Sequence, residues 1–304
     1  MTNMTNARWQ RWLVALHGLG LAAWVLGLWP RSPALALAGL VVVPLLSRLC
    51  MLPQFVLMAW VCRHEGRTAP LRLLRGWWAE SRWAALVFGW WQPFRQHAVP
   101  DALPARAADG VAPRGVVLVH GFLCNRAFWT PWFAPLRARG HAFVAVTLEP
   151  AFGSIDDYAA TIDAAVRRVA EATGRAPLIV GHSMGGVAIR AWLRTTPGAD
   201  ARVQGVVTIG SPHAGTWPAA HARSTAGQQM RLHGPWLRAL AAAETPARRA
   251  LFRCWYTDGD NVVYPHATAM LEGADNRLLP GLAHVELAFD PRVLGDCLEL
   301  LNAP

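Results

Sequence analysis

The pattern of hydrophobic and polar residues divides the chain into two parts. Residues 12 to 62 contain only two charged side chains, Arg31 and Arg48, whereas the chain after about residue 100 mixes charged and apolar residues throughout. Long apolar stretches favour a lipid environment, and mixed stretches are typical of a water-soluble domain. We therefore expect a membrane segment followed by a soluble domain.

Two apolar runs in the first part are long enough to cross a membrane. Residues 12 to 29 are eighteen consecutive uncharged residues with tryptophan near both ends, which predicts a transmembrane helix. The second run, 34 to 62, is interrupted by Pro44, Arg48 and Pro53, so its helix is either kinked or divided into a spanning and an interfacial part. A secretory signal peptide is the alternative for the first run, but no small-residue cleavage site follows it. A hairpin of two spans is the simplest interpretation.

The arginines that flank these runs predict their orientation. Arg8 and Arg11 precede the first run, and one arginine lies between the two. Five arginines follow the second run: Arg63, Arg67, Arg72, Arg75 and Arg82. The positive-inside rule then places both ends of the hairpin in the cytoplasm, with the soluble domain on that face of a bacterial inner membrane. A single span with the domain outside is the alternative.

A stretch rich in tryptophan and arginine connects the hairpin to the soluble domain. Residues 71 to 94 contain five tryptophans among arginines, as expected of a helix in the headgroup layer. The alternative is that these tryptophans pack against the following domain. Residues 98 to 114 are rich in Ala, Pro, Asp and Gly without periodicity, which indicates a linker. The predicted domains are a membrane anchor at 1–97 and a soluble domain at 115–304.

Strand and helix patterns alternate in the soluble domain. Apolar, β-branched strands are predicted at 116–119, 143–148, 178–180, 206–209 and 251–256. Helices are predicted at 128–139, 155–173, 184–195 and 293–301, and Ser154 with Asp157 supplies a capping box for the second of them. This alternation predicts an α/β fold with a mostly parallel sheet flanked by helices.

Charge and cysteine content exclude several function classes. The net charge is +10, but all 29 basic residues are arginine and no basic run is interleaved with aromatic residues, so nucleic acid is not an expected partner. Five cysteines without repeated spacing argue against a disulfide framework, and no C-x-x-C metal or redox motif is present.

A nucleophile motif follows the third predicted strand. Gly181, His182, Ser183, Met184 and Gly185 match G-x-S-x-G directly after a strand and before a helix. This context is typical of a nucleophile elbow, in which the serine occupies strained backbone geometry. The glycines have a steric reason, because side chains on either side of the serine would collide across the turn.

The serine needs a base and an orienting carboxylate, which follow it in the order acid, then histidine. His284 lies in the loop before the last helix, whereas His266 would share a loop with the acids, so we expect His284 to be the base. Asp258 and Asp260 both follow a predicted strand, and Asp260 is preferred because apolar residues follow it. Glu286 is expected to be a surface residue.

The oxyanion formed by attack on an ester carbonyl needs two backbone N–H donors. Met184 follows the nucleophile and supplies one donor, and Phe122, after His120 and Gly121 at the end of the first strand, supplies the other. His120 and His182 are expected to be structural hydrogen-bonding residues rather than proton carriers.

These features resemble the bacterial triacylglycerol lipases and esterases of the α/β-hydrolase superfamily. The matching stretches are VVLVHGF (116–122), VGHSMGGV (180–187), TIGSPHAGT (208–216), DGDNVV (258–263) and HVELAFDPRV (284–293). The resemblance implies that the Pro-His-x-Gly element around His213 shapes a pocket wall and that residues 217–249 form a helical lid. The membrane hairpin departs from the secreted lipases of the family, which argues against digestion of extracellular fat.

The combined prediction is a membrane-anchored serine hydrolase that cleaves carboxylic esters of lipids or other apolar acyl compounds. Ser183 attacks, His284 moves the proton, Asp260 orients His284, and no metal or organic cofactor is required. An acyltransferase that uses the same triad, and a non-catalytic membrane scaffold that retains the fold, are the alternatives. A permease would need more spans than the sequence offers.

Overall fold

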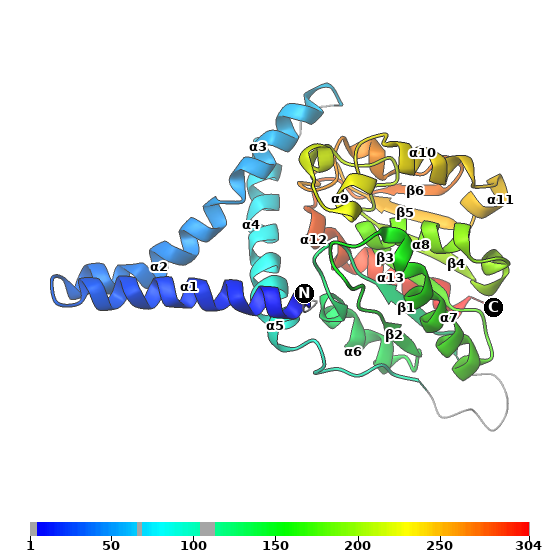
Figure 1. Cartoon of the computed structure of the whole chain (residues 1–304), viewed down its shortest axis with the longest axis horizontal. Helices are drawn as coiled ribbons and strands as arrows, with labels where there is room; N and C mark the ends of the chain where they lie inside the picture. Colours follow the sequence, from blue (N-terminus) through cyan, green and yellow to red (C-terminus); the bar gives the residue numbers. More distant parts are fainter. Residues whose placement is uncertain (1–4, 66–68, 104–112, 304) are drawn as a thin grey trace.

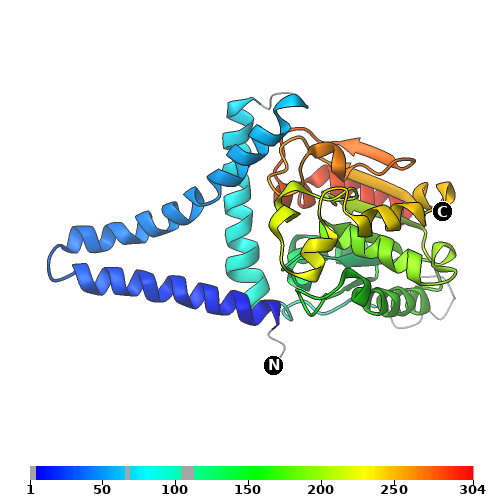
Figure 2. The same cartoon turned by 45° about the horizontal axis from the view of Figure 1, so that its top comes forward.

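The N-terminal segment, defined as residues 5–97, is helical: a hairpin of two long helices projects away from the rest of the chain, and a third long helix lies beside the soluble domain (Figures 1 and 2). A computed structural model describes residues 5–65, 69–103 and 113–303; the predicted basic residue Arg67 and most of the predicted linker lie outside them. The helices of the segment are α1 (Asn6–Leu28), α2 (Pro33–Leu49), α3 (Leu52–Val61), η1 (Cys62–His64), α4 (Pro70–Leu86), η2 (Val87–Trp91) and α5 (Gln92–Phe94).

Helices α1 and α2 form a hairpin whose tip points away from the soluble domain, and α4 lies across its open end (Figures 1 and 2). Helix α1 and the helical stretch Pro33–His64 are long and apolar enough to cross a membrane, with mean hydropathies of 1.4 and 2.2. Helix α2 continues through Pro44 and ends at Leu49, and α3 begins with Pro53 in its first turn. A proline is tolerated there because first-turn N–H groups have no partner within the helix.

The tryptophans of α4 and of the π-helix η2 divide between two environments. Trp83 packs on Phe289 of the soluble domain with ring centroids 4.8 Å apart, and Trp91 contacts the same ring. Trp78 and Trp90 are each 52% exposed. Part of this stretch therefore packs on the domain, as the alternative interpretation expects, and a position in the headgroup layer stays a prediction.

The soluble domain is built on a six-stranded parallel sheet with strand order β2-β1-β3-β4-β5-β6. The α/β fold with a parallel sheet is confirmed, whereas the sixth strand was not predicted. The strands are β1 (Val116–Val119), β2 (Phe143–Ala145), β3 (Leu178–His182), β4 (Gly205–Ile209), β5 (Phe252–Tyr256) and β6 (Asp275–Leu278). Val119 pairs with Gly181, and His182 pairs with Ile209. The carboxyl ends of the three central strands are therefore level, and the loops that follow them share one edge of the sheet.

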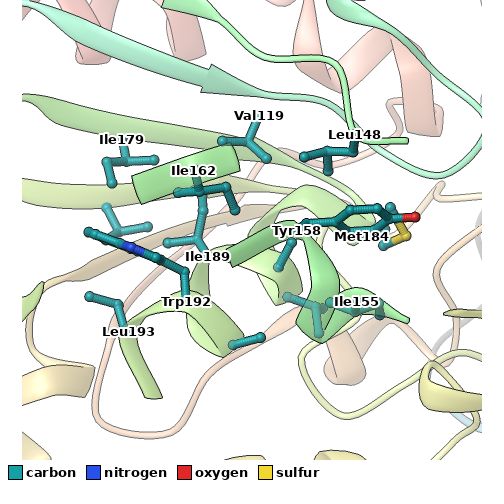
Figure 3. Close-up of a cluster of buried hydrophobic side chains, with 14 of the residues drawn as sticks. Val119, Leu148, Ile155, Tyr158, Ile162, Ile179, Met184, Ile189, Trp192 and Leu193 are labelled. Atoms are coloured by element: carbon teal, nitrogen blue, oxygen red, sulfur yellow. The ribbon is translucent and has the colours of Figure 1, made fainter. Parts of the chain in front are cut away.

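Helices cover both faces of the sheet. One face carries η4 (Ile155–Tyr158), α7 (Ala159–Thr173) and α8 (Met184–Thr195), and the other carries α6 (Thr130–Ala138), α12 (His284–Ala288) and α13 (Pro291–Asn302). Figure 3 shows the first core, in which Ile162, Ile179, Ile189 and Trp192 pack together. The capping box of Ser154 and Asp157 is present at the start of η4, as predicted.

Four short helices fill the region between β4 and β5 where the family resemblance implies a lid. They are η6 (Trp217–His221), α9 (Thr225–Gln229), α10 (Pro235–Ala242) and α11 (Pro246–Arg249). A buried ion pair joins this region to α8, because the guanidinium of Arg190 donates to both carboxylate oxygens of Glu244 at 2.7 and 2.9 Å. The two side chains are 1% and 0% exposed.

Replacing Arg190 by Met is expected to lower the free energy of unfolding by about 3–5 kcal/mol, because the buried Glu244 carboxylate loses both short hydrogen bonds and keeps only the 3.7 Å contact with Arg249. Chemical unfolding of the full chain in detergent measures this loss. The matched control is Arg248→Met, whose pair with the 41% exposed Asp200 side chain should be worth at most about 1 kcal/mol. Equal losses in the two variants would contradict the expectation.

Candidate active site

Ser183 occupies a strained turn between β3 and α8. Its backbone angles are φ 54° and ψ −129°, which L residues rarely adopt, and its N–H donates to the carbonyl of Ile209 at 2.9 Å. The residue is 7% exposed at the carboxyl edge of the sheet. The turn thus projects the hydroxyl toward the loops that follow the neighbouring strands.

The glycines around Ser183 allow this turn to be tight. A Cβ on Gly181 would approach Gly186 N at 2.7 Å, and a Cβ on Gly185 would collide with the carbonyl oxygens of Val119 and His120. Gly121 faces the serine directly, since a Cβ there would lie 2.8 Å from Ser183 Cβ. The absence of side chains at these positions brings the loop after β1 against the serine turn.

His284 and Asp260 form a buried pair beside this turn. The His284 Nδ1 to Asp260 Oδ2 distance is 2.8 Å, and the residues are 4% and 1% exposed. Asp260 Oδ1 accepts hydrogen bonds from the N–H groups of Val262 and Val263, so the carboxylate is fixed by three contacts. Burial lowers the pKa of His284, but the charge and hydrogen bond of Asp260 outweigh burial, and the net pKa is raised.

The two candidate acids have different hydrogen-bond partners in the structure. Asp258 Oδ1 accepts a hydrogen bond from the Gly281 N–H group, whereas Asp260 contacts the histidine. Gly210, at the end of β4, has φ 55°, and a Cβ there would approach Asp260 Oδ2 at 3.1 Å and His284 Nδ1 at 3.2 Å. The pair therefore lies against the end of β4, next to the strand that leads into Ser183.

The backbone N–H groups of Phe122 and Met184 remain available at this edge. Within the described ranges, neither group donates a hydrogen bond to another residue. Leu123, the next residue after Phe122, has φ 57°, and the Phe122 ring contacts Phe152 at 5.9 Å between centroids. Two free donors beside a serine are what an oxyanion requires.

The three supporting histidines are buried and neutral. His120 Nε2 accepts a hydrogen bond from Leu148 N–H at 2.9 Å, and burial lowers its pKa to about 4. His182 donates from Nε2 to the His284 carbonyl at 3.3 Å and stacks on Phe128. His213 contacts the Thr208 hydroxyl at 2.9 Å. Burial lowers the pKa of His182 and of His213 well below the ordinary value, so these histidines position loops.

The N-terminal segment contributes polar side chains that no sequence motif indicated. Asn6 and Gln10 of α1 donate to the carbonyls of Cys124 and Leu123, in the loop after β1, at 2.7 and 3.0 Å. In α4, Glu80 is 2% exposed and accepts hydrogen bonds from the start of α12. Long sequence separation hides such contacts, although a lone acidic residue in an apolar tryptophan-rich helix is itself unusual.

The expectation that Glu286 is a surface residue is wrong. Its side chain is 12% exposed, because one carboxylate oxygen accepts the Ala283 N–H at 3.1 Å and the other pairs with Arg75 of α4 at 2.9 Å. The carboxylate thus caps the helix that begins at His284. The pairing partner lies 211 residues earlier in the chain, where local patterns give no sign of it.

One group of potential metal ligands lies where the N-terminal segment meets the soluble domain. Within residues 5–65, 69–103 and 113–303, ligand atoms of Cys62, Glu65 and His266 lie within 4.8 Å of one another. Glu65 Oε2 accepts the His266 N–H at 3.0 Å, which explains its position without a metal. The five cysteines are free, and all but Cys50 are buried.

Comparisons with known proteins agree with the fold of the soluble domain. Residues 116–298, more than half of the chain, match the Alpha/beta hydrolase family. A mature lipase from Bacillus licheniformis superposes with a TM-score of 0.56 at 17% identity, over 67% of this chain and 96% of the lipase. Lipase B from Aspergillus fumigatus gives 0.54 at 18% identity, over 64% and 54% of the two chains. These similarities to solved structures establish the fold. The search of curated proteins gives no match.

Replacing Asp260 by Asn is expected to lower kcat by roughly 10⁴-fold, because the amide no longer holds the required tautomer of His284 or stabilises its charged form. Asp258→Asn is the matched control and should stay within about threefold of wild type. Ester hydrolysis by purified, folded variants decides between the acids. A larger loss for Asp258→Asn than for Asp260→Asn would reverse the assignment.

Proposed function

The chain belongs to the alpha/beta hydrolase family, and we propose that it is a membrane-anchored serine hydrolase that cleaves carboxylic esters of lipids or other apolar acyl compounds. The observation that carries the proposal is the 2.8 Å contact between His284 and Asp260 at the strand edge where Ser183 occupies its strained turn. A serine, a histidine and a carboxylate in this order and setting perform acyl transfer.

In the proposed mechanism, Ser183 Oγ attacks the ester carbonyl while His284 Nε2 accepts its proton. Asp260 holds the Nδ1–H of His284 and stabilises the imidazolium that forms. The N–H groups of Phe122 and Met184 donate to the developing oxyanion. His284 then returns the proton to the departing alcohol, which leaves an acyl group on Ser183. Water, activated by His284, hydrolyses this acyl-enzyme and restores the serine.

The anchor is proposed to hold the hydrolase domain against a bacterial inner membrane, on its cytoplasmic side. Two apolar helices of spanning length support this, as do the arginines at both ends of the hairpin. The start of α1 and the residue that follows η1 both contact the soluble domain, through Asn6 and Glu65. Both ends of such a hairpin would emerge from the membrane on the side where the soluble domain lies.

A cavity within the N-terminal segment supports an apolar substrate. It has a volume of about 550 Å³ and is lined mainly by apolar residues, among them Trp9, Leu13, Val14 and Phe88; its polar lining residues are Asn6, Gln10, His17 and Ser47. Leu123, the residue after Phe122, also lines it. An acyl chain that enters from the bilayer would thus be received by apolar side chains next to the loop that carries a proposed oxyanion donor.

Replacing Ser183 by Ala is expected to lower kcat for ester hydrolysis by roughly 10⁵-fold, because the nucleophile is lost. A fluorophosphonate probe should label the wild type and Ser211→Ala, a serine control at the neighbouring strand end, but not Ser183→Ala. Undiminished hydrolysis by Ser183→Ala would disprove the assignment. A folded wild type that resists labelling would favour the scaffold, and ester formation with added alcohols would favour an acyltransferase.

A larger side chain in the cavity should lower activity toward a long-chain ester and leave activity toward a short-chain ester unchanged. Leu13→Trp is expected to lower kcat/KM for a 4-nitrophenyl ester of a C16 acid roughly tenfold or more, since several methylene contacts are lost. Hydrolysis of 4-nitrophenyl acetate should be unchanged. Leu16→Trp is the control, because Leu16 lies one turn away, is 65% exposed and is not part of the cavity lining. Equal activity of the two variants toward the C16 ester would exclude this acyl site.

A further inference from the structure

Glu80 of α4 contacts the helix that carries His284. Its carboxylate accepts the Val285 N–H, with distances of 2.9 Å to Oε2 and 3.1 Å to Oε1, and Oε2 also accepts the Glu286 N–H at 3.3 Å. The residue is 2% exposed and lies 205 positions before Val285. A carboxylate from the N-terminal segment is therefore buried at the N-terminal end of α12, the helix whose first residue is the proposed base His284.

We propose that Glu80 is a positioning residue for His284, which makes the N-terminal segment part of the active site as well as an anchor. The inference rests on the proposed function, in which His284 is the base. His284 is the first residue of α12, and Val285 and Glu286 are the second and third. By binding their N–H groups, Glu80 fixes the backbone that sets the direction of the imidazole toward Asp260 and Ser183.

This anchoring is needed because α12 is only five residues long and begins in a loop. Short helices are not stable alone, so tertiary contacts must fix their ends. The capping box of Glu286 satisfies the Ala283 N–H, and the His284 N–H donates to Asn261 Oδ1 at 3.2 Å. Glu80 completes this set by accepting the next two N–H groups, each at the positive end of the helix.

Other contacts place α4 and its neighbours firmly in this position. Asn261, which holds the His284 N–H, donates to Gln54 Oε1 of α3 at 3.1 Å. On α4 itself, Gly76 faces Ala283, and Trp83 packs on Phe289 at the end of α12. The N-terminal segment therefore contacts α12 at both ends, and Glu80 is the buried charged side chain of α4 in this contact.

The charges around Glu80 give it an electrostatic role. His284 and Glu286 face it from α12, Asp260 faces it from the loop after β5, and Arg75 of its own helix is paired with Glu286. Burial is the main reason that the pKa of Glu80 is raised to about 7. The charge of His284 and the hydrogen bonds from the two backbone N–H groups lower this pKa, whereas the charge of Asp260 raises it further. Its negative charge in turn contributes to the raised pKa of His284. An ionised Glu80 thus stabilises the imidazolium formed during attack.

The test compares Glu80→Ala, Glu80→Gln and the control Glu65→Ala in the full-length chain in detergent, with 4-nitrophenyl butyrate as substrate. Glu65 also joins the segment to the domain, by accepting the His266 N–H, and among the described residues it forms no hydrogen bond or ion pair with α12. We expect Glu80→Ala to lower kcat roughly 10- to 100-fold with little change in KM, because the base is misplaced. Glu65→Ala should retain wild-type kcat.

The Glu80→Gln variant tests the negative charge of Glu80 separately from its hydrogen bonds to α12. The amide oxygen of Glu80→Gln still accepts N–H groups, so His284 keeps its place but loses a negative neighbour. Since neutral His284 is the active form, a lower His284 pKa should move the acidic limb of kcat/KM to lower pH by about half a unit or more. Histidine NMR titration, with His284 assigned from a His284→Asn spectrum, should give the same shift without substrate.

The outcomes distinguish the two proposals. An inactive wild type would refute the proposed function, yet the NMR titration would still report whether Glu80 acts on His284. Wild-type kcat in folded Glu80→Ala, or a His284 pKa that does not move in Glu80→Gln, would overturn the positioning role. Equal losses in Glu65→Ala and Glu80→Ala would also overturn it, because general detachment of the segment would then explain both. If Glu80→Ala does not fold, Glu80→Gln alone decides.

Discussion

The close approach of backbone to backbone at the carboxyl edge of the sheet is the constraint on which the structure depends. The turn at Ser183 fits only because Gly181 and Gly185 leave room for Gly186 and for the end of β1. Gly210 leaves similar room for the Asp260–His284 pair. Any side chain at these points would separate loops that must meet, so the site requires glycine at positions fixed by the sheet.

The edge of the sheet is completed by the N-terminal segment. Asn6 and Gln10 bind the carbonyls of the loop after β1, Gln54 binds Asn261, and Glu80 binds the start of α12. These hydrogen bonds are directional and buried or partly buried, so they fix loops that would otherwise be the least stable parts of the domain. The loops that carry the proposed catalytic groups are thus held partly by residues outside the sheet and its flanking helices.

Local pattern predicted the central strands, the flanking helices and the serine turn, because buried parallel strands leave continuous apolar runs in the sequence. It did not predict β6, because Asp275–Leu278 is an edge strand in which three consecutive polar residues precede the leucine and no residue is buried. Asp260 was preferred over Asp258 from the residues that follow it, and only coordinates show which carboxylate faces His284. Glu80 and Glu286 could not be placed, because their partners lie more than 200 residues away.

The position of α4 between the hairpin and the sheet has a consequence for how the chain can be divided. A cut at the apparent domain boundary, in the low-complexity stretch before residue 114, would produce a fragment with every strand and the complete G-x-S-x-G motif. That fragment would nevertheless expose the α12 backbone that Glu80 covers and the Phe289 ring that Trp83 covers. The smallest fragment that keeps these contacts is therefore longer than the sheet and its flanking helices, because it must include α4.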